Sequence, residues 1–142
     1  MDHVSLVTIG VRDLDRATAY YEALGWRRSS ASVDGAVAFL SGHGSVALSL
    51  FGRDALAAEA GVPPASGAGR SLALAVNLPS EAAVDAYVAA AVAAGGRVTS
   101  PPTRAEWGGY SGYLTDPDGH LWEVAHNPGF PLADDGTVTL PG

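Results

Sequence analysis

The stretch Asp116-Pro117-Asp118-Gly119-His120-Leu121-Trp122-Glu123 reads as a tight turn that leads into a β-strand. In such a turn proline fixes φ, and glycine supplies the position where φ needs to be positive. The residues after the turn are mostly apolar, and Glu123 is the one acid among them. Because an unpaired buried carboxylate is costly, we expect Glu123 to have a partner, to hold a metal or a ligand, or to reach solvent.

The rest of the chain repeats one order of elements twice. In the first half, alternation and turn residues predict one helix, with Asp13 as its N-cap, and strands over 4–11, 26–30, 36–40 and 45–51. The second half predicts a helix with Ser80 as its N-cap, and strands over 71–76, 97–99, 110–115 and 120–126. Each half is therefore strand, helix, strand, strand, strand, which indicates a duplicated βαβββ module.

We expect these modules to form a single α+β domain over residues 1–142. Its predicted parts are a first module over 1–52, a linker over 53–69, a second module over 70–127 and a C-terminal tail over 128–142. Within the linker, residues 55–60 have the composition of one or two helical turns.

The composition excludes several functions. The chain has 142 residues, 47% of them hydrophobic, which is enough for a core without disulfides or structural metals. Cysteine is absent, so thiolate catalysis and Cys-based zinc sites are excluded. The net charge of −7 argues against nucleic acid as a partner. Neither a signal-peptide pattern nor an apolar run of roughly 20 residues is present, so we expect a cytoplasmic protein with no membrane partner.

Two βαβββ modules in tandem resemble the vicinal oxygen chelate superfamily, which includes glyoxalase I, bleomycin-resistance proteins and extradiol dioxygenases. The resemblance covers residues 3 to about 128, and it implies curled mixed sheets around a cavity. It does not settle the activity, because this superfamily hosts lyases, isomerases, dioxygenases and drug-binding proteins. The motifs that carry the resemblance are Val11-Arg12-Asp13-Leu14, Tyr20-Tyr21, Leu24-Gly25-Trp26, the segment 107–113 with its sequence WGGYSGY, and the turn 116–119 with Glu123.

The resemblance implies metal ligands on the first and last strands of each module. Carried over by position, these places fall on Leu6, on Leu48 (or Ser49 after a slip of one residue), on Ser71 and on Glu123. Metalloenzymes of the superfamily have His, Glu or Gln at most of these places, and here only Glu123 is of that kind. None of the four histidines is expected to share a strand face with Glu123. Because a divalent cation takes about three or four protein ligands, we expect no metal and no other cofactor.

Alternation along the strands predicts which side chains line the cavity. The result is an apolar cavity with one carboxylate and a few hydroxyls, which is typical of a small-molecule site. Trp107 and Tyr110, on the glycine-rich loop before the seventh predicted strand, are further candidates for ligand contact because aromatic side chains offer large, flat surfaces. The predicted ligand-binding residues are Leu6, Thr8, Leu48, Leu50, Ser71, Ala73, Trp107, Tyr110, Leu121 and Glu123.

Three functions follow from these patterns. The leading one is a metal-free protein that binds a small, partly hydrophobic or aromatic molecule. The second is a glyoxalase-like lyase or isomerase, or less readily a dioxygenase, with Glu123 as general base or metal ligand. The third is a degenerate domain that only makes protein contacts and whose pocket is filled by its own side chains. Independently of these functions, Arg70, Arg97 or Arg104 could pair with Glu123, which would make that site structural. A homodimer is expected because exposed sheet edges invite pairing.

Overall fold

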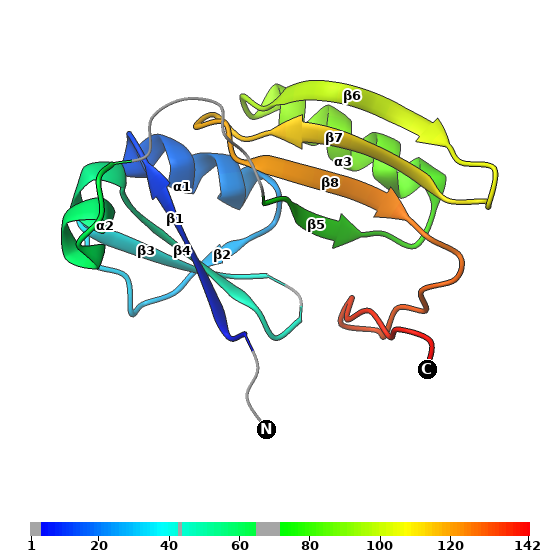
Figure 1. Ribbon diagram of the computed structural model, residues 1–142, viewed down its shortest axis with the longest axis horizontal. Coiled ribbons are helices and arrows are strands. Elements are labelled where there is room, and N and C mark those ends of the chain that lie inside the picture. The colour runs from blue at the N-terminus through cyan, green and yellow to red at the C-terminus, as the bar shows by residue number, and fades with distance from the viewer. Residues whose placement is uncertain (1–3, 43, 65–71) are drawn as a thin grey trace. The chain divides into compact units, whose positions relative to one another are not determined.

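The computed structural model describes residues 4–42, 44–64 and 72–142 (Figure 1). The chain divides into two compact units, Met1–Gly69 and Arg70–Gly142. Each unit contains one four-stranded mixed sheet and at least one helix, which confirms the predicted α+β fold of two tandem βαβββ modules. Among the described residues, no helix is long and apolar enough to cross a membrane.

In the first unit, the strands form sheet A in the order β1-β4-β3-β2. Its elements are β1 (Leu6–Val11), α1 (Leu14–Ala23), β2 (Arg27–Arg28), β3 (Val37–Ser41), β4 (Ala47–Gly52) and α2 (Arg53–Ala60). Asp13 is the N-cap of α1, as predicted, because its Oδ1 accepts a 3.0 Å hydrogen bond from the backbone N–H of Arg16. Helix α2 lies within the predicted linker and begins at Arg53, two residues before the predicted helical turns.

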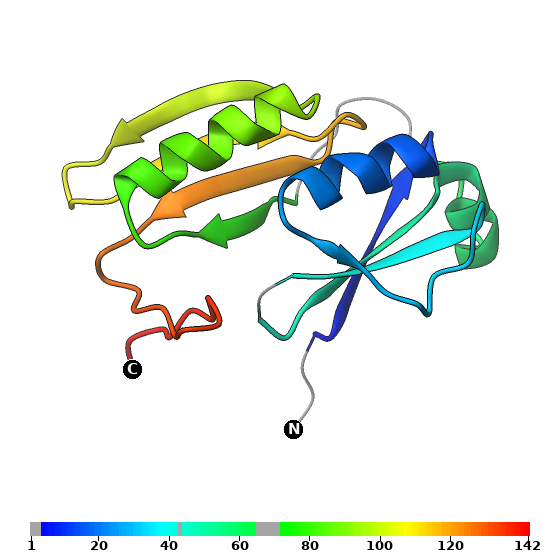
Figure 2. The same cartoon turned by 180° about the vertical axis from the view of Figure 1, so that it is seen from behind.

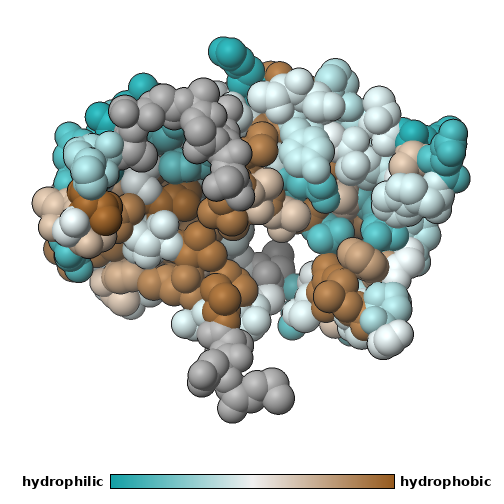
Figure 3. Space-filling view, in the orientation of Figure 1, coloured by the Kyte–Doolittle hydropathy of each residue, from teal (hydrophilic) through white to brown (hydrophobic). Residues whose placement is uncertain are grey.

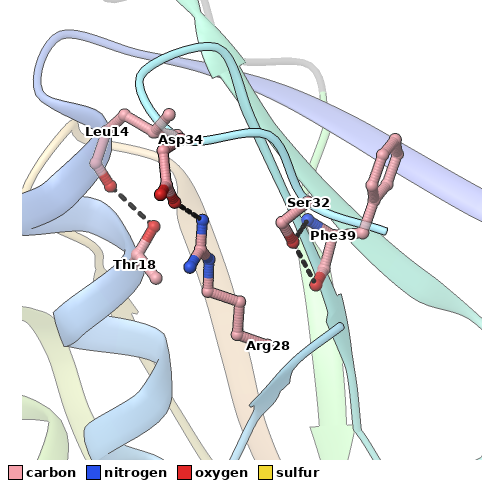
Figure 4. A network of polar contacts seen from close by, with 6 residues as sticks. All are labelled: Leu14, Thr18, Arg28, Ser32, Asp34 and Phe39. Atoms are coloured by element: carbon pink, nitrogen blue, oxygen red, sulfur yellow. Dashed lines mark hydrogen bonds and ion pairs between the residues drawn. The ribbon is translucent and has the colours of Figure 1, made fainter. Parts of the chain in front are cut away.

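The segment between β2 and β3 is held by polar contacts near α1 (Figure 4). Arg28 forms a 2.6 Å ion pair with Asp34. The hydroxyl oxygen of Ser32 accepts a 2.9 Å hydrogen bond from the backbone N–H of Phe39. These contacts fix the start of β3, whose residues then pair with β4.

Sheet A packs one face against α1 and turns its other face away from that helix. Tyr20 and Tyr21 of α1 are buried together with Leu40, Leu48 and Leu50 of the sheet. We call the face turned away from α1 the far face of sheet A. It carries Leu6, Thr8, Arg27, Val37, Phe39, Ser41, Ala47, Ser49 and Phe51, as the strand register and the alternation of side chains require.

The prediction that Leu48 and Leu50 share a face with Leu6 and Thr8 is wrong. Strand β4 pairs with β1 so that Thr8 lies beside Ser49, and Leu48 lies beside Val7. Leu48 and Leu50 are 2% and 0% exposed and belong to the core under α1. The error is a shift of one residue, which moves every side chain of a strand to the opposite face of the sheet.

In the second unit, the strands form sheet B in the order β5-β8-β7-β6, the same arrangement as in sheet A. Its elements are β5 (Leu74–Asn77), α3 (Glu81–Ala93), β6 (Arg97–Arg104), β7 (Tyr110–Thr115) and β8 (Leu121–His126). Ser80 is the N-cap of α3, as predicted, and its Oγ accepts a 3.1 Å hydrogen bond from the N–H of Ala83. Val84 of this helix is buried with Leu114 and Val124 of the sheet.

Helix α3 lies on one face of sheet B only, as the two opposite views of the molecule show (Figures 1 and 2). We call the face turned away from α3 the far face of sheet B. Strand β6 is longer than predicted, because Pro101 and Pro102 do not end it. They lie on an edge strand, where a missing N–H is tolerated, and the β6–β7 register shifts around them. Gly112 makes room for this irregularity, since a Cβ there would lie 2.7 Å from the Pro102 nitrogen.

Candidate functional site

The far face of sheet B carries a tyrosine–carboxylate pair. Tyr113 of β7 lies directly opposite Glu123 of β8 in the antiparallel register. The Tyr113 hydroxyl donates a hydrogen bond of 2.5 Å to Glu123 Oε2. Both residues are half-buried. Glu123 therefore has a partner, and this partner is a tyrosine on the next strand. Of the arginines considered from the sequence, Arg70 lies outside the described residues, and neither Arg97 nor Arg104 is paired with Glu123.

The Tyr113 hydroxyl is the donor of this hydrogen bond. The bond to Glu123, the negative charge of that carboxylate and partial burial all raise the pKa of Tyr113 above its ordinary value. The phenol consequently keeps its proton at neutral pH, and the carboxylate accepts the hydrogen bond from it.

By the strand register, the pair shares its face with small and apolar side chains and also with the polar Asn77, Ser111 and Thr115. Ala75 of β5 lies beside Glu123 in the parallel register and is exposed. Leu121 and Ala125 flank Glu123 on the same face of β8. Across the sheet, a row of four residues shares this face: Ala75, Glu123, Tyr113 and Ser100. The direct neighbour of Glu123 on β5 is therefore a methyl group, and Asn77 is the next residue of β5 on this face.

A second tyrosine–carboxylate pair lies on the opposite face of the same sheet. Tyr110 donates a 2.6 Å hydrogen bond to Asp85 of α3, and the carboxylate raises the pKa of Tyr110. Arg104 contacts Glu81, also on α3, through two hydrogen bonds of 2.8 and 2.7 Å, and this guanidinium lowers the pKa of Glu81. Tyr110, predicted to contact a ligand from the glycine-rich loop, therefore does not share a face with Glu123, because it lies three positions before Tyr113 on the strand.

Trp107 lies at the tip of the hairpin between β6 and β7. The turn is closed by a hydrogen bond of 3.0 Å from Gly108 N–H to the Ala105 carbonyl, and Gly108 has φ +98°. A Cβ on Gly109 would lie 2.0 Å from the Trp107 ring, so the indole rests on the backbone of that glycine. The ring is otherwise open, since Trp107 is 66% exposed.

The remaining predicted site residues are distributed as follows. Leu6 and Thr8 lie on the far face of sheet A, where Leu6 is 42% exposed. Apart from Arg27 of the edge strand β2, which lies opposite Ser41, the described strand residues on that far face are uncharged, and apolar residues gather over the first unit (Figure 3). Ala73 is exposed and lies just before β5, and Leu121 lies on the face of Glu123. Ser71 is outside the described residues.

The residues at the expected metal places do not fit a divalent cation. Leu6 offers no donor atom, and Ser49, which takes the place first assigned to Leu48, is a hydroxyl only 3% exposed. One oxygen of Glu123 is already bonded to Tyr113. Among residues 4–42, 44–64 and 72–142, no group of three or more His, Asp or Glu side chains could hold a metal ion.

Comparison with known proteins gives one family. The model of the Glyoxalase/Bleomycin resistance protein/Dioxygenase superfamily matches residues 1–124. The chain is similar to a glyoxalase-related enzyme from Fulvimarina pelagi, with 32% identity, a TM-score of 0.88 and 100% of both chains covered. It is also similar to a lactoylglutathione lyase from Agrobacterium tumefaciens, with 26% identity, a TM-score of 0.67 and coverage of 89% of this chain and 95% of that one. No curated protein matches the chain.

Proposed function

Because the chain belongs to the Glyoxalase/Bleomycin resistance protein/Dioxygenase superfamily, we propose that it binds a small, partly hydrophobic or aromatic molecule without the help of a metal. The observation that carries this proposal is the Tyr113–Glu123 pair on the far face of sheet B. A few polar groups among small and apolar side chains are the usual composition of a small-molecule site. The exposed indole of Trp107 offers a further flat surface of the kind that aromatic ligands contact.

Calorimetric titration with a panel of aromatic compounds tests this function. We expect saturable binding of at least one compound, which is recovered unchanged after incubation. Glu123→Gln should weaken that binding about tenfold, since a hydrogen bond to a charged group contributes roughly 1.5–3 kcal/mol. The control is Asp85→Asn, which alters the other tyrosine-bonded carboxylate on the α3 face and should bind as the wild type does. A panel with no saturable binder at millimolar concentration would contradict the proposal.

The absence of a metal is tested separately. Untagged protein is loaded with nickel, zinc, manganese or iron, desalted and analysed for metal. We expect no retained metal, because a lone carboxylate does not hold these ions against water. A stoichiometric, tightly held metal would overturn this part of the proposal.

A second candidate is a glyoxalase-like lyase or isomerase in which Glu123 acts as general base. Its support is the 32% identity to a glyoxalase-related enzyme over both whole chains. Turnover of an α-oxo thiol adduct that disappears in Glu123→Gln, while the variant stays folded, would favour it over simple binding. The homodimer, the cytoplasmic location and the interaction-only alternative stay predictions from the sequence.

A further inference from the structure

Within the part of the chain that the structure describes, Glu123 uses only one of its two oxygens. Oε2 accepts the hydrogen bond from Tyr113. Among the residues that the structure describes, none donates a hydrogen bond to Oε1. Glu123 is half-buried, and its direct neighbour on β5 is Ala75, whose side chain is a single methyl group.

The described basic side chains of the second unit do not neutralise Glu123. Arg104 is bound to Glu81, on the other side of the sheet. His126 lies three residues along β8, on the opposite strand face, and its Nδ1 contacts the Leu78 carbonyl at 3.0 Å. Arg97 begins β6 opposite Thr115, and His120 precedes β8; neither forms an ion pair with Glu123.

The pair therefore presents a fixed negative charge with a free acceptor. A carboxylate accepts hydrogen bonds and donates none, so a neutral acceptor or an anion finds no partner at Oε1. Charge-assisted bonds from ammonium groups to carboxylates are roughly twice as strong as neutral ones. The net charge of −7 favours the approach of cations and disfavours that of anions.

We propose that Tyr113 orients Glu123 so that Oε1 accepts a hydrogen bond from a protonated amine, and that this pair makes the site selective for aromatic or amphipathic amines. The inference rests on the proposed binding function and adds the charge class of the ligand. Tyr113 is a positioning residue, because it acts through Glu123. Ala75 leaves the space through which the ammonium group approaches.

Three probes of similar shape and different charge test this selectivity. Naphthylmethylamine, naphthylmethanol and naphthoate are titrated calorimetrically at neutral pH and fixed ionic strength. We expect the amine to bind roughly 10- to 100-fold more tightly than the alcohol, with naphthoate weakest. Glu123→Gln should bind the amine and the alcohol equally, and it should stay folded because an amide oxygen still accepts the Tyr113 hydroxyl.

Two tyrosine variants test the positioning role. Tyr113→Phe should weaken amine binding several-fold and leave the affinity for the alcohol unchanged. Tyr110→Phe, which removes the matched bond to Asp85 on the α3 face, should change neither affinity. Raising the salt concentration should weaken binding of the amine and not of the alcohol.

The outcomes separate this inference from the proposed function. Equal affinities of the three probes for the wild type would overturn the charge selectivity and leave the binding function standing. Tighter binding of naphthoate than of the amine would do the same. Absence of binding by all three probes overturns the inference, and the wider panel then decides the binding function by itself.

Discussion

The two units have the same architecture and different chemistry on their far faces. In sheet A, β1, β4 and β3 place Thr8, Ser49 and Phe39 in one row. In sheet B, the corresponding strands β5, β8 and β7 place Ala75, Glu123 and Tyr113 in one row. Thr8 and Ala75 lie equally far before the N-caps Asp13 and Ser80, so the two rows occupy equivalent positions.

This comparison shows how little the fold constrains the row. The tyrosine–carboxylate pair of the second unit corresponds to a phenylalanine and a serine in the first. Phe39 has no hydroxyl to donate, and Ser49 has no charge. The same backbone therefore supports an uncharged row in one unit and a tyrosine–carboxylate pair in the other.

The sharpest test of this difference is to place the charge in the first unit. Ser49→Glu should lower the free energy of unfolding by about 3–5 kcal/mol, because Ser49 is 3% exposed and the new carboxylate has no partner. Adding Phe39→Tyr should restore about 1 kcal/mol, since the phenol then lies opposite the carboxylate as in the second unit.

Urea unfolding of the four proteins of this double-mutant cycle measures both effects. Phe39→Tyr alone is the control. An unchanged stability of Ser49→Glu would mean that the two rows are equally open to charge, and the comparison would lose its physical basis.

The second prediction concerns the two faces of sheet A. Leu48→Ala should lower the free energy of unfolding by about 2–5 kcal/mol, because Leu48 is 2% exposed and its removal leaves a cavity under α1. The matched control Leu6→Ala should cost less than about 1 kcal/mol, because that side chain is 42% exposed on the far face. Denaturant unfolding measures both. Equal losses would return Leu48 to the face on which the sequence first placed it.

The face of sheet A on which Leu48 lies could not be predicted from the sequence. Helix caps at Asp13 and Ser80 and the repeated order of elements follow from local chemistry, and the structure confirms them. Aligning Gly44 with Gly119 assigned Leu48 to the place of Glu123, whereas the register assigns Ser49. Ser49 lies five positions after Gly44, whereas Glu123 lies four positions after Gly119, and a one-residue error inverts a whole strand.

The partner of Glu123 was missed although the sequence contained a signal for it. Tyr113 and Glu123 lie at equal distances from Asp118, the centre of the turn closed by the hydrogen bond from Asp116 N–H to the His120 carbonyl. A symmetric hairpin about that centre places the two side chains opposite one another. Counting positions from Asp118 in the same way shows that Tyr110 does not lie opposite Glu123. The sequence had no comparable signal for the contacts of Tyr110 and Arg104 with α3, because they depend on tertiary packing.

The third prediction concerns a feature that the two units share. Asp13→Ala and Ser80→Ala each remove a side chain that caps a helix, at hydrogen-bond distances of 3.0 and 3.1 Å. Each should lower the free energy of unfolding by about 1 kcal/mol. Thermal and urea unfolding of the two single variants measures the losses. Asp13→Ser and Ser80→Asp serve as controls that keep a cap. A loss confined to one unit would mean that the repeated caps are not energetically equivalent.

The smallest expected effect is the pH dependence of the Tyr113–Glu123 bond. Because the pKa of Tyr113 is raised in the folded state, the unfolded chain loses this proton at lower pH than the folded chain. The stability that the bond contributes is therefore full below the ordinary tyrosine pKa of about 10, and it is lost as the pH rises through the folded-state pKa.

Tyr113→Phe makes the second unit resemble the first at this position, and this variant lacks the pH-dependent contribution of the bond to stability. The difference in unfolding free energy between wild type and variant, less than about 1 kcal/mol for a half-buried pair, should shrink from neutral pH to about pH 11. Tyr110 is present in both proteins, so its own titration cancels. A difference that stays constant over this range would mean that the hydroxyl makes no net contribution, and the row of the second unit would then differ from that of the first only by the charge of Glu123.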